Sequence, residues 1–100
     1  MKSSEAQIYY KCAAKLKRGR MVQYIEFTDG YATRQVEEYQ DENEWFFCGK
    51  DSSLRDKIRM CDQPISAIKV KDENIIGAIE FETAWEAAND WKIANKLVNA

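Results

Sequence analysis

The sequence predicts an α+β fold, an antiparallel three- to four-stranded β-meander packed against a C-terminal helix, with an amphipathic basic N-terminal helix. Three observations predict it. An Asp-Gly pair joins two β-rich runs, an apolar stripe of helical period follows Gly77, and another apolar stripe with several lysines opens the chain. A chain of 100 residues suits one hydrophobic core, so we expect a single domain over residues 1–100.

Residues 1–20 are expected to form the basic helix, with its regular turns at about 4–18. Apolar side chains recur there at intervals of four residues, at Ile8, Cys12 and Leu16. Such a stripe suits a helix that lies on a sheet. Gly19 is then expected to end the helix, because glycine adopts the left-handed conformation common at that position.

Residues 21–49 are expected to form the β-meander, and a hairpin is its strongest local pattern. Asp29-Gly30 favours a tight type I′ turn. A loop of these two residues pairs Phe27 with Ala32 and Ile25 with Arg34. The expected core face is Met21, Ile25, Phe27, Ala32 and Val36. The expected opposite face is Val22, Tyr24, Glu26, Thr28, Tyr31, Thr33, Gln35, Glu37 and Tyr39.

Two further structured regions are expected after the hairpin. Residues 44–48 are apolar and aromatic, which predicts a third strand. Residues 50–76 are expected to form a loop and short elements, from which Ile65, Ile68 and Val70 reach the core, and the pattern at 54–60 fits either helix or strand. Residues 77–98 predict the C-terminal helix, whose apolar positions suit packing on the sheet.

Charge is unevenly distributed along a chain whose net charge is only −2. The first twenty residues carry six cations against Glu5, and residues 21–50 carry seven acids against two cations. The candidate basic surface consists of Lys11, Lys15, Arg18 and Arg20, with Lys17 beside them. These side chains suit phosphates or an acidic protein surface. They also suit a merely solvated helix end that interacts with the helix dipole, which is the commoner role.

Arg34 is the most informative single residue, because the expected register places its guanidinium among apolar neighbours. The commoner explanation is an intramolecular partner such as Glu38, Glu26 or a helix carboxylate. The functional explanation is an anchor for a partner's carboxylate, with Tyr31 and Gln35 on the same surface. Three tyrosines of the opposite face, Tyr24, Tyr31 and Tyr39, form an interaction patch if no loop covers them.

The sequence excludes several function classes. It has no histidine, so histidine bases and histidine metal ligands are absent, and it has no phosphate-binding loop or calcium loop. Its three cysteines have no paired spacing, and we interpret them as reduced, mostly buried thiols. We therefore expect no enzyme activity, no cofactor and no metal. Without a signal or membrane segment, a cytoplasmic location is expected.

A pattern over residues 22–86 carries a family resemblance. Residues 27–37 read Phe-Thr-Asp-Gly-Tyr-Ala-Thr-Arg-Gln-Val-Glu, followed by Cys61-Asp62-Gln63-Pro64 and then by Phe81 and Trp85 on the helix. This resembles small uncharacterised bacterial proteins with the pattern DGYxxRQV, DQP and FxxxW. The resemblance implies a bacterial or phage setting and brings no activity with it.

The sequence therefore favours a noncatalytic protein-interaction or regulatory module, such as a bacterial adaptor or a phage-encoded inhibitor. Another protein is the expected partner, through either the basic residues or the surface at Tyr31, Arg34 and Gln35. Two alternatives stay open. Nucleic-acid binding through the basic N-terminal segment predicts an affinity that falls steeply with salt. A small-ligand site or a histidine-free enzyme would need a pocket beside Arg34.

Overall fold

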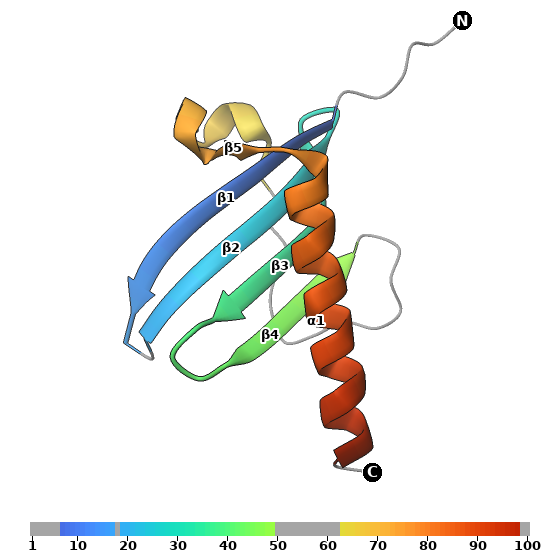
Figure 1. Ribbon diagram of the computed structural model, residues 1–100. Helices are drawn as coiled ribbons and strands as arrows, with labels where there is room; N and C mark the ends of the chain where they lie inside the picture. The colour runs from blue at the N-terminus through green and yellow to red at the C-terminus, as the bar shows by residue number, and fades with distance from the viewer. Residues whose placement is uncertain (1–6, 18, 50–62, 99–100) are drawn as a thin grey trace, which may run out of the picture.

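The computed structural model describes residues 7–17, 19–49 and 63–98, the last four of these as backbone only. Within these ranges the chain forms one antiparallel sheet of five strands in the order β4-β3-β2-β1-β5 and one α-helix, which lies across one face of the sheet (Figure 1). The elements are β1 Gln7–Leu16, β2 Gly19–Thr28, β3 Tyr31–Tyr39, β4 Glu44–Gly49, β5 Ile75–Ile76 and α1 Ala78–Val98. The α+β class, the strand at β4 and the C-terminal helix are confirmed.

The predicted N-terminal helix is wrong, because residues 7–16 form strand β1. β1 pairs with β2 along its whole length, from Gln7 opposite Thr28 to Leu16 opposite Gly19. The interval of four residues was ambiguous, since it is close to one helical turn and is also twice the period of a strand. Gly19 takes a φ of +120° in the reversal between the two strands and does not end a helix. Residues 4–6 and Arg18 lie outside the described residues.

The hairpin of β2 and β3 contains a β-bulge that the expected register lacks. Phe27 pairs with Ala32 as predicted, but Glu26 pairs with Arg34, which leaves Thr33 as an extra residue in β3. Every pair beyond the bulge is therefore one position out of the expected register, with Ile25 opposite Gln35. A shift of one position moves side chains to the other face of a sheet, so the expected division of β3 into two faces is wrong from Arg34 onward.

Both faces of the sheet are covered. We call the face under α1 the helix face and the other the second face. Phe81, Ala84 and Ala88 of α1 pack on the helix face against buried side chains of β2, β3 and β4, which are Val22, Tyr24, Val36 and Phe47. The second face holds a separate buried cluster of Tyr10, Ile25, Phe27 and Ala32. The predicted set of core residues is thus divided, because Val36 faces α1 whereas Ile25 and Phe27 do not.

The chain segment before α1 covers part of the second face and then crosses the edge of the sheet. Ile65, Ile68 and Val70 pack on the second-face cluster, as predicted. The backbone N–H of Ile65, in the 3-10 turn η1 Ile65–Ala67, donates to Gly30 O at 2.7 Å. A second 3-10 turn, η2 Asp72–Asn74, leads into β5. Residues 50–62, including the ambiguous stretch at 54–60, lie outside the described ranges.

Candidate interaction surface

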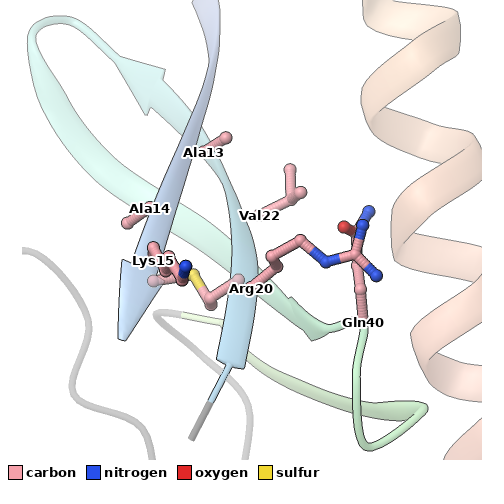
Figure 2. A pocket seen from close by; sticks show the side chains of 7 residues that line it. Ala13, Ala14, Lys15, Arg20, Val22 and Gln40 are labelled. Atoms are coloured by element: carbon pink, nitrogen blue, oxygen red, sulfur yellow. The ribbon is translucent and has the colours of Figure 1, made fainter. Parts of the chain in front are cut away.

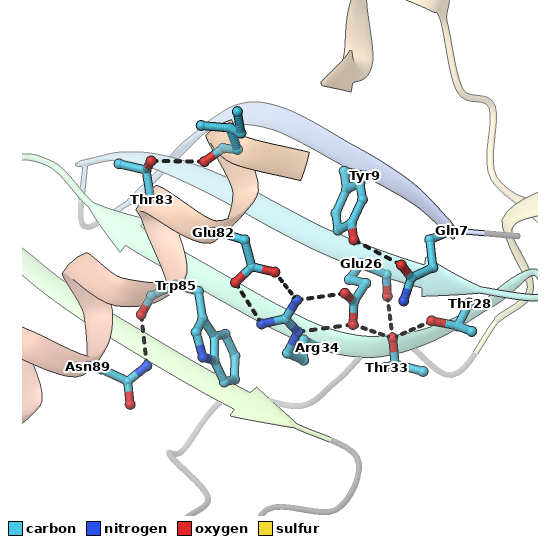
Figure 3. A network of polar contacts seen from close by, with 11 residues as sticks. Gln7, Tyr9, Glu26, Thr28, Thr33, Arg34, Glu82, Thr83, Trp85 and Asn89 are labelled. Atoms are coloured by element: carbon cyan, nitrogen blue, oxygen red, sulfur yellow. Dashed lines mark hydrogen bonds and ion pairs between the residues drawn. The ribbon is translucent and has the colours of Figure 1, made fainter. Parts of the chain in front are cut away.

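Arg34 is held by two carboxylates at the junction of β2, β3 and α1 (Figure 3). Its Nε donates to Glu26 Oε1 at 3.0 Å and its Nη2 to Glu26 Oε2 at 2.6 Å. From the helix, Glu82 accepts from Nη1 at 3.1 Å and also from Nη2. The guanidinium carbon lies 4.9 Å from the ring centroids of both Phe81 and Trp85. The prediction of an intramolecular partner is confirmed, with Glu26 and a helix carboxylate in that role.

The bulge explains why these groups meet. It places Thr33 and Arg34, which are adjacent in sequence, within reach of the same side chain on β2. Thr33 Oγ1 donates to Glu26 Oε1 at 2.7 Å, beside the bonds from Arg34. Burial alone would raise the pKa of Glu26, but the hydrogen bonds from Arg34 and Thr33 outweigh it and lower the pKa. The hydrogen bonds that Arg34 donates to Glu26 in turn raise the pKa of Arg34.

Arg34 is therefore occupied within the protein. Four of its hydrogen bonds go to Glu26 and Glu82, and its flat faces lie against aromatic rings. Its side chain is only 23% exposed, and that of Glu26 only 7%. The arrangement joins α1 to the centre of the sheet and leaves little of the guanidinium for a partner's carboxylate.

The other predicted residues on β3 do not form one surface with Arg34. Tyr31 is exposed beside the turn between β2 and β3, whereas Gln35 is 1% exposed and faces the second side of the sheet. The three tyrosines Tyr24, Tyr31 and Tyr39 do not form one exposed patch either. Tyr24 is buried on the helix face, and Tyr39 is buried on the second face because the bulge reverses its orientation.

The basic residues of β1 and β2 lie together on the helix face, but two of the four predicted are paired. Lys11 donates to Glu80 Oε2 of α1 at 2.9 Å, and this bond raises the pKa of Lys11. Arg20 donates from Nη2 to Asp41 Oδ1 at 2.7 Å and from its backbone N–H to Asp41 Oδ2 at 2.8 Å. Bonds from Arg20 lower the pKa of Asp41. Of the other two predicted cations, Arg18 is outside the described residues.

Lys15 and Lys17 differ from these cations, since both are exposed and form no ion pair within the described ranges. Lys15 lies opposite Arg20 at the end of the hairpin. A cavity of about 300 Å³ opens there, between the end of β1 and the start of the turn after β3 (Figure 2). Its lining is mainly apolar, with two cations at the rim, and consists of Ala13, Ala14, Lys15, Arg20, Met21, Val22 and Gln40.

A second cavity, of about 550 Å³, lies along the outer edge of β1. Lys69 and Lys71 contribute to it, and neither forms an ion pair within the described part of the chain. The rest of its lining is Tyr10, Cys12, Ala13, Glu73 and Asn74. Sequence reasoning missed Lys69 and Lys71, although the Lys-Val-Lys alternation after Ile68, which packs on the second-face cluster, was a signal that both lysines point away from the core.

Other expected features are resolved in part. Cys48 is buried and Cys12 half-buried, and neither forms a disulfide, whereas Cys61 is not among the described residues. Among the residues that the structure places, no three side chains of the types that bind metals gather together. None of the described helices is long and apolar enough to cross a membrane.

Comparison with family models, with curated proteins and with solved structures finds no match to this chain. The resemblance to small bacterial proteins therefore stays a prediction. The candidate surface rests on the geometry of this chain alone, which points to the exposed lysines around β1.

Proposed function

We propose that the protein is a noncatalytic protein-binding module whose contact surface is the basic end of the β1-β2 hairpin. The observation that carries the proposal is the contrast between paired and unpaired cations. Lys11, Arg20 and Arg34 each contact a carboxylate of the same chain, whereas Lys15 and Lys17 extend into solvent with no such partner among the described residues. Exposed cations around a small apolar cavity suit a partner with an acidic surface.

Loss of charge at the hairpin end should weaken binding without unfolding the protein. We expect the double variant K15Q/K17Q to bind its partner about 5- to 30-fold more weakly. Each ion pair at the rim of an interface contributes about 1 kcal/mol or less. The free energy of unfolding should change by less than about 0.5 kcal/mol, as for other exposed substitutions.

A matched control separates this local effect from the change in net charge. I79E/I93E makes the same change of two charges at two exposed isoleucines of α1, which are 84% and 59% exposed. The partner is captured on the immobilised chain from an extract of its host cells, identified, purified and titrated against all three proteins. Equal weakening by both double variants, or by neither, would exclude the hairpin end as the contact surface.

The same titration distinguishes nucleic acid from protein. Binding to single-stranded or double-stranded oligonucleotides that falls steeply with salt, in place of a captured protein, would reassign the lysines to phosphate contacts. If the lysines bind protein, any binding of the chain to oligonucleotides should be the same in K15Q/K17Q as in the wild type.

A further inference from the structure

Among the described residues, the outer edge of β1 has no neighbouring strand over most of its length. β5 pairs only with Tyr9 and Tyr10, after which no described strand lies beside β1 (Figure 1). Asn74 Nδ2 donates to Lys11 O at 3.0 Å, which shows that the backbone groups of Lys11 point away from β2. Because these directions alternate along a strand, the N–H and C=O groups of Ala13 and Lys15 point outward too. This edge can therefore pair with another strand.

The side chains along this edge differ on the two faces. Lys11 and Lys15 lie on the helix face, where Lys15 has no carboxylate partner among the described residues. The second face carries small or apolar side chains, namely Cys12, Ala14 and Leu16, and Leu16 is 40% exposed. A strand added here would bury apolar side chains against one face and place its other side chains beside lysines.

The cavity beside β1 extends this pattern. Continuation of the β1-β5 register would place Asn74 opposite Lys11 and Glu73 opposite Cys12, but the chain turns away there as η2. The space it leaves is the cavity of about 550 Å³, whose charged lining is Lys69, Lys71 and Glu73. An added strand in line with β5 would end in this cavity, next to more cations than anions.

Charge also distinguishes between occupants. Lysines on a sheet edge oppose pairing between two copies, since an antiparallel β1-β1 pair would bring the Lys11 and Lys15 rows of both copies onto one face. A partner strand with carboxylates on that face would instead pair with them. The edge therefore discriminates against a second copy and in favour of an acidic segment.

We propose that the β1 edge from Lys11 to Leu16 binds an extended segment of a partner protein in which apolar and acidic side chains alternate, as an additional strand of the sheet. This rests on the proposed protein-binding function and specifies the partner's chemistry. The backbone of the segment would bond to Ala13 and Lys15. Its carboxylates on the helix face would contact Lys15, and a carboxylate at the end that enters the cavity would contact Lys69 and Lys71.

The probe is a short peptide with blocked ends in which valine and glutamate alternate, titrated into the ¹⁵N-labelled full chain. We expect amide shifts and slowed hydrogen exchange centred on Ala13 and Lys15, and at least about tenfold weaker binding of a matched valine-lysine peptide. Absence of binding, equal binding of both peptides, or shifts confined to α1 would overturn the proposal. If the lysines serve only to prevent pairing between two copies of the chain, neither peptide should bind.

Two variants test the backbone and the charges separately. Ala13→Pro removes an outward N–H that does not bond to β2, so the fold should survive while peptide binding is lost. A folded A13P protein that binds normally would exclude strand addition. The triple reversal K15E/K69E/K71E leaves the backbone edge intact and should invert the preference, so that the valine-lysine peptide binds better. Retained preference for glutamate would exclude these lysines as the contacts.

The result is separable from the function proposed above. If K15Q/K17Q weakens capture of the purified partner but A13P does not, the hairpin end binds protein by side chains alone and strand addition is wrong. If neither variant affects capture, the protein-binding surface itself has been misplaced.

Discussion

Arg34 and Lys15 are both cations on the helix face of the sheet, and their surroundings differ. Arg34 lies under α1, where Glu26 and Glu82 accept its hydrogen bonds and two aromatic rings cover it. Lys15 lies at the end of β1, beyond α1, and contacts no carboxylate within the described ranges. Such surroundings suit a structural role for Arg34 and leave Lys15 available to a partner.

The comparison shows that a charged residue cannot be assigned to binding from its type alone. Both cations belong to β-strands, and the sequence predicted burial only for Arg34. Burial with two carboxylates favours a role in stability, because removing one partner leaves the others uncompensated. The comparison therefore predicts that mutations in the Arg34 cluster cause the large losses of stability. Mutation of Lys15 should weaken binding instead.

Arg34→Met should have the largest effect and lower the free energy of unfolding by about 3 kcal/mol, because it leaves the Glu26 carboxylate buried without its cation. Urea unfolding followed by circular dichroism measures it. The double variant R34M/E26L should recover part of the loss, since it removes both charges together. A loss below about 1 kcal/mol in R34M would show that the ion pairs contribute little to stability.

Glu26→Gln should have the next largest effect, about 2 kcal/mol at neutral pH, because a hydrogen-bonded carboxylate is lost. The folded protein lowers the pKa of Glu26 from its ordinary value of 4.5. Such a group stabilises the fold above the pKa of the unfolded chain, and its contribution is lost as the pH falls through the folded pKa. Stability measured from neutral pH downward should therefore fall less in E26Q than in the wild type. As a control at an exposed site of α1, Glu86→Gln should change the free energy of unfolding at neutral pH by less than about 0.5 kcal/mol.

Gly19→Ala tests the other region and should cost about 1–2 kcal/mol. Gly19 has a φ of +120°, and an added Cβ would lie only 2.9 Å from Asp41 Cβ, in the group that binds Arg20. Gly30→Ala is the matched control, because its φ is +91° but no atom lies within 4 Å of the added Cβ. Gly19→Ala should therefore be the more destabilising of the two variants, because only its added Cβ collides with Asp41. Equal losses in thermal unfolding would show that backbone strain alone decides both.

The sequence predicted those parts of the fold whose local pattern was unambiguous. The C-terminal helix has apolar residues at helical spacing without a competing strand pattern. Asp29-Gly30 correctly predicts the turn between β2 and β3. β1 was missed because its apolar residues lie four apart, which fits both periods. β5 was missed because a strand of two residues has no recognisable period.

The candidate site was predictable to a similar degree. A carboxylate partner for Arg34 followed from the cost of burying an unpaired charge, and Glu26 was among the partners expected. The bulge at Thr33 had no signal in the sequence, so the face on which Arg34 lies was not predictable. Its separation from Gln35 follows from the alternation of side chains along any strand. Lys69 and Lys71 approach β1 only through the path of the chain around the edge of the sheet, which no local pattern encodes.

The bulge at Thr33 also bears on the register in which β2 and β3 pair. Without the extra residue, Arg34 would lie opposite Ile25, on the face away from Glu26 and Glu82. That misaligned hairpin would bury a cation on one side of the sheet and a carboxylate on the other, and both errors raise its free energy. The Arg34 cluster, which forms only in the alignment with the bulge, therefore favours that alignment over the one without it.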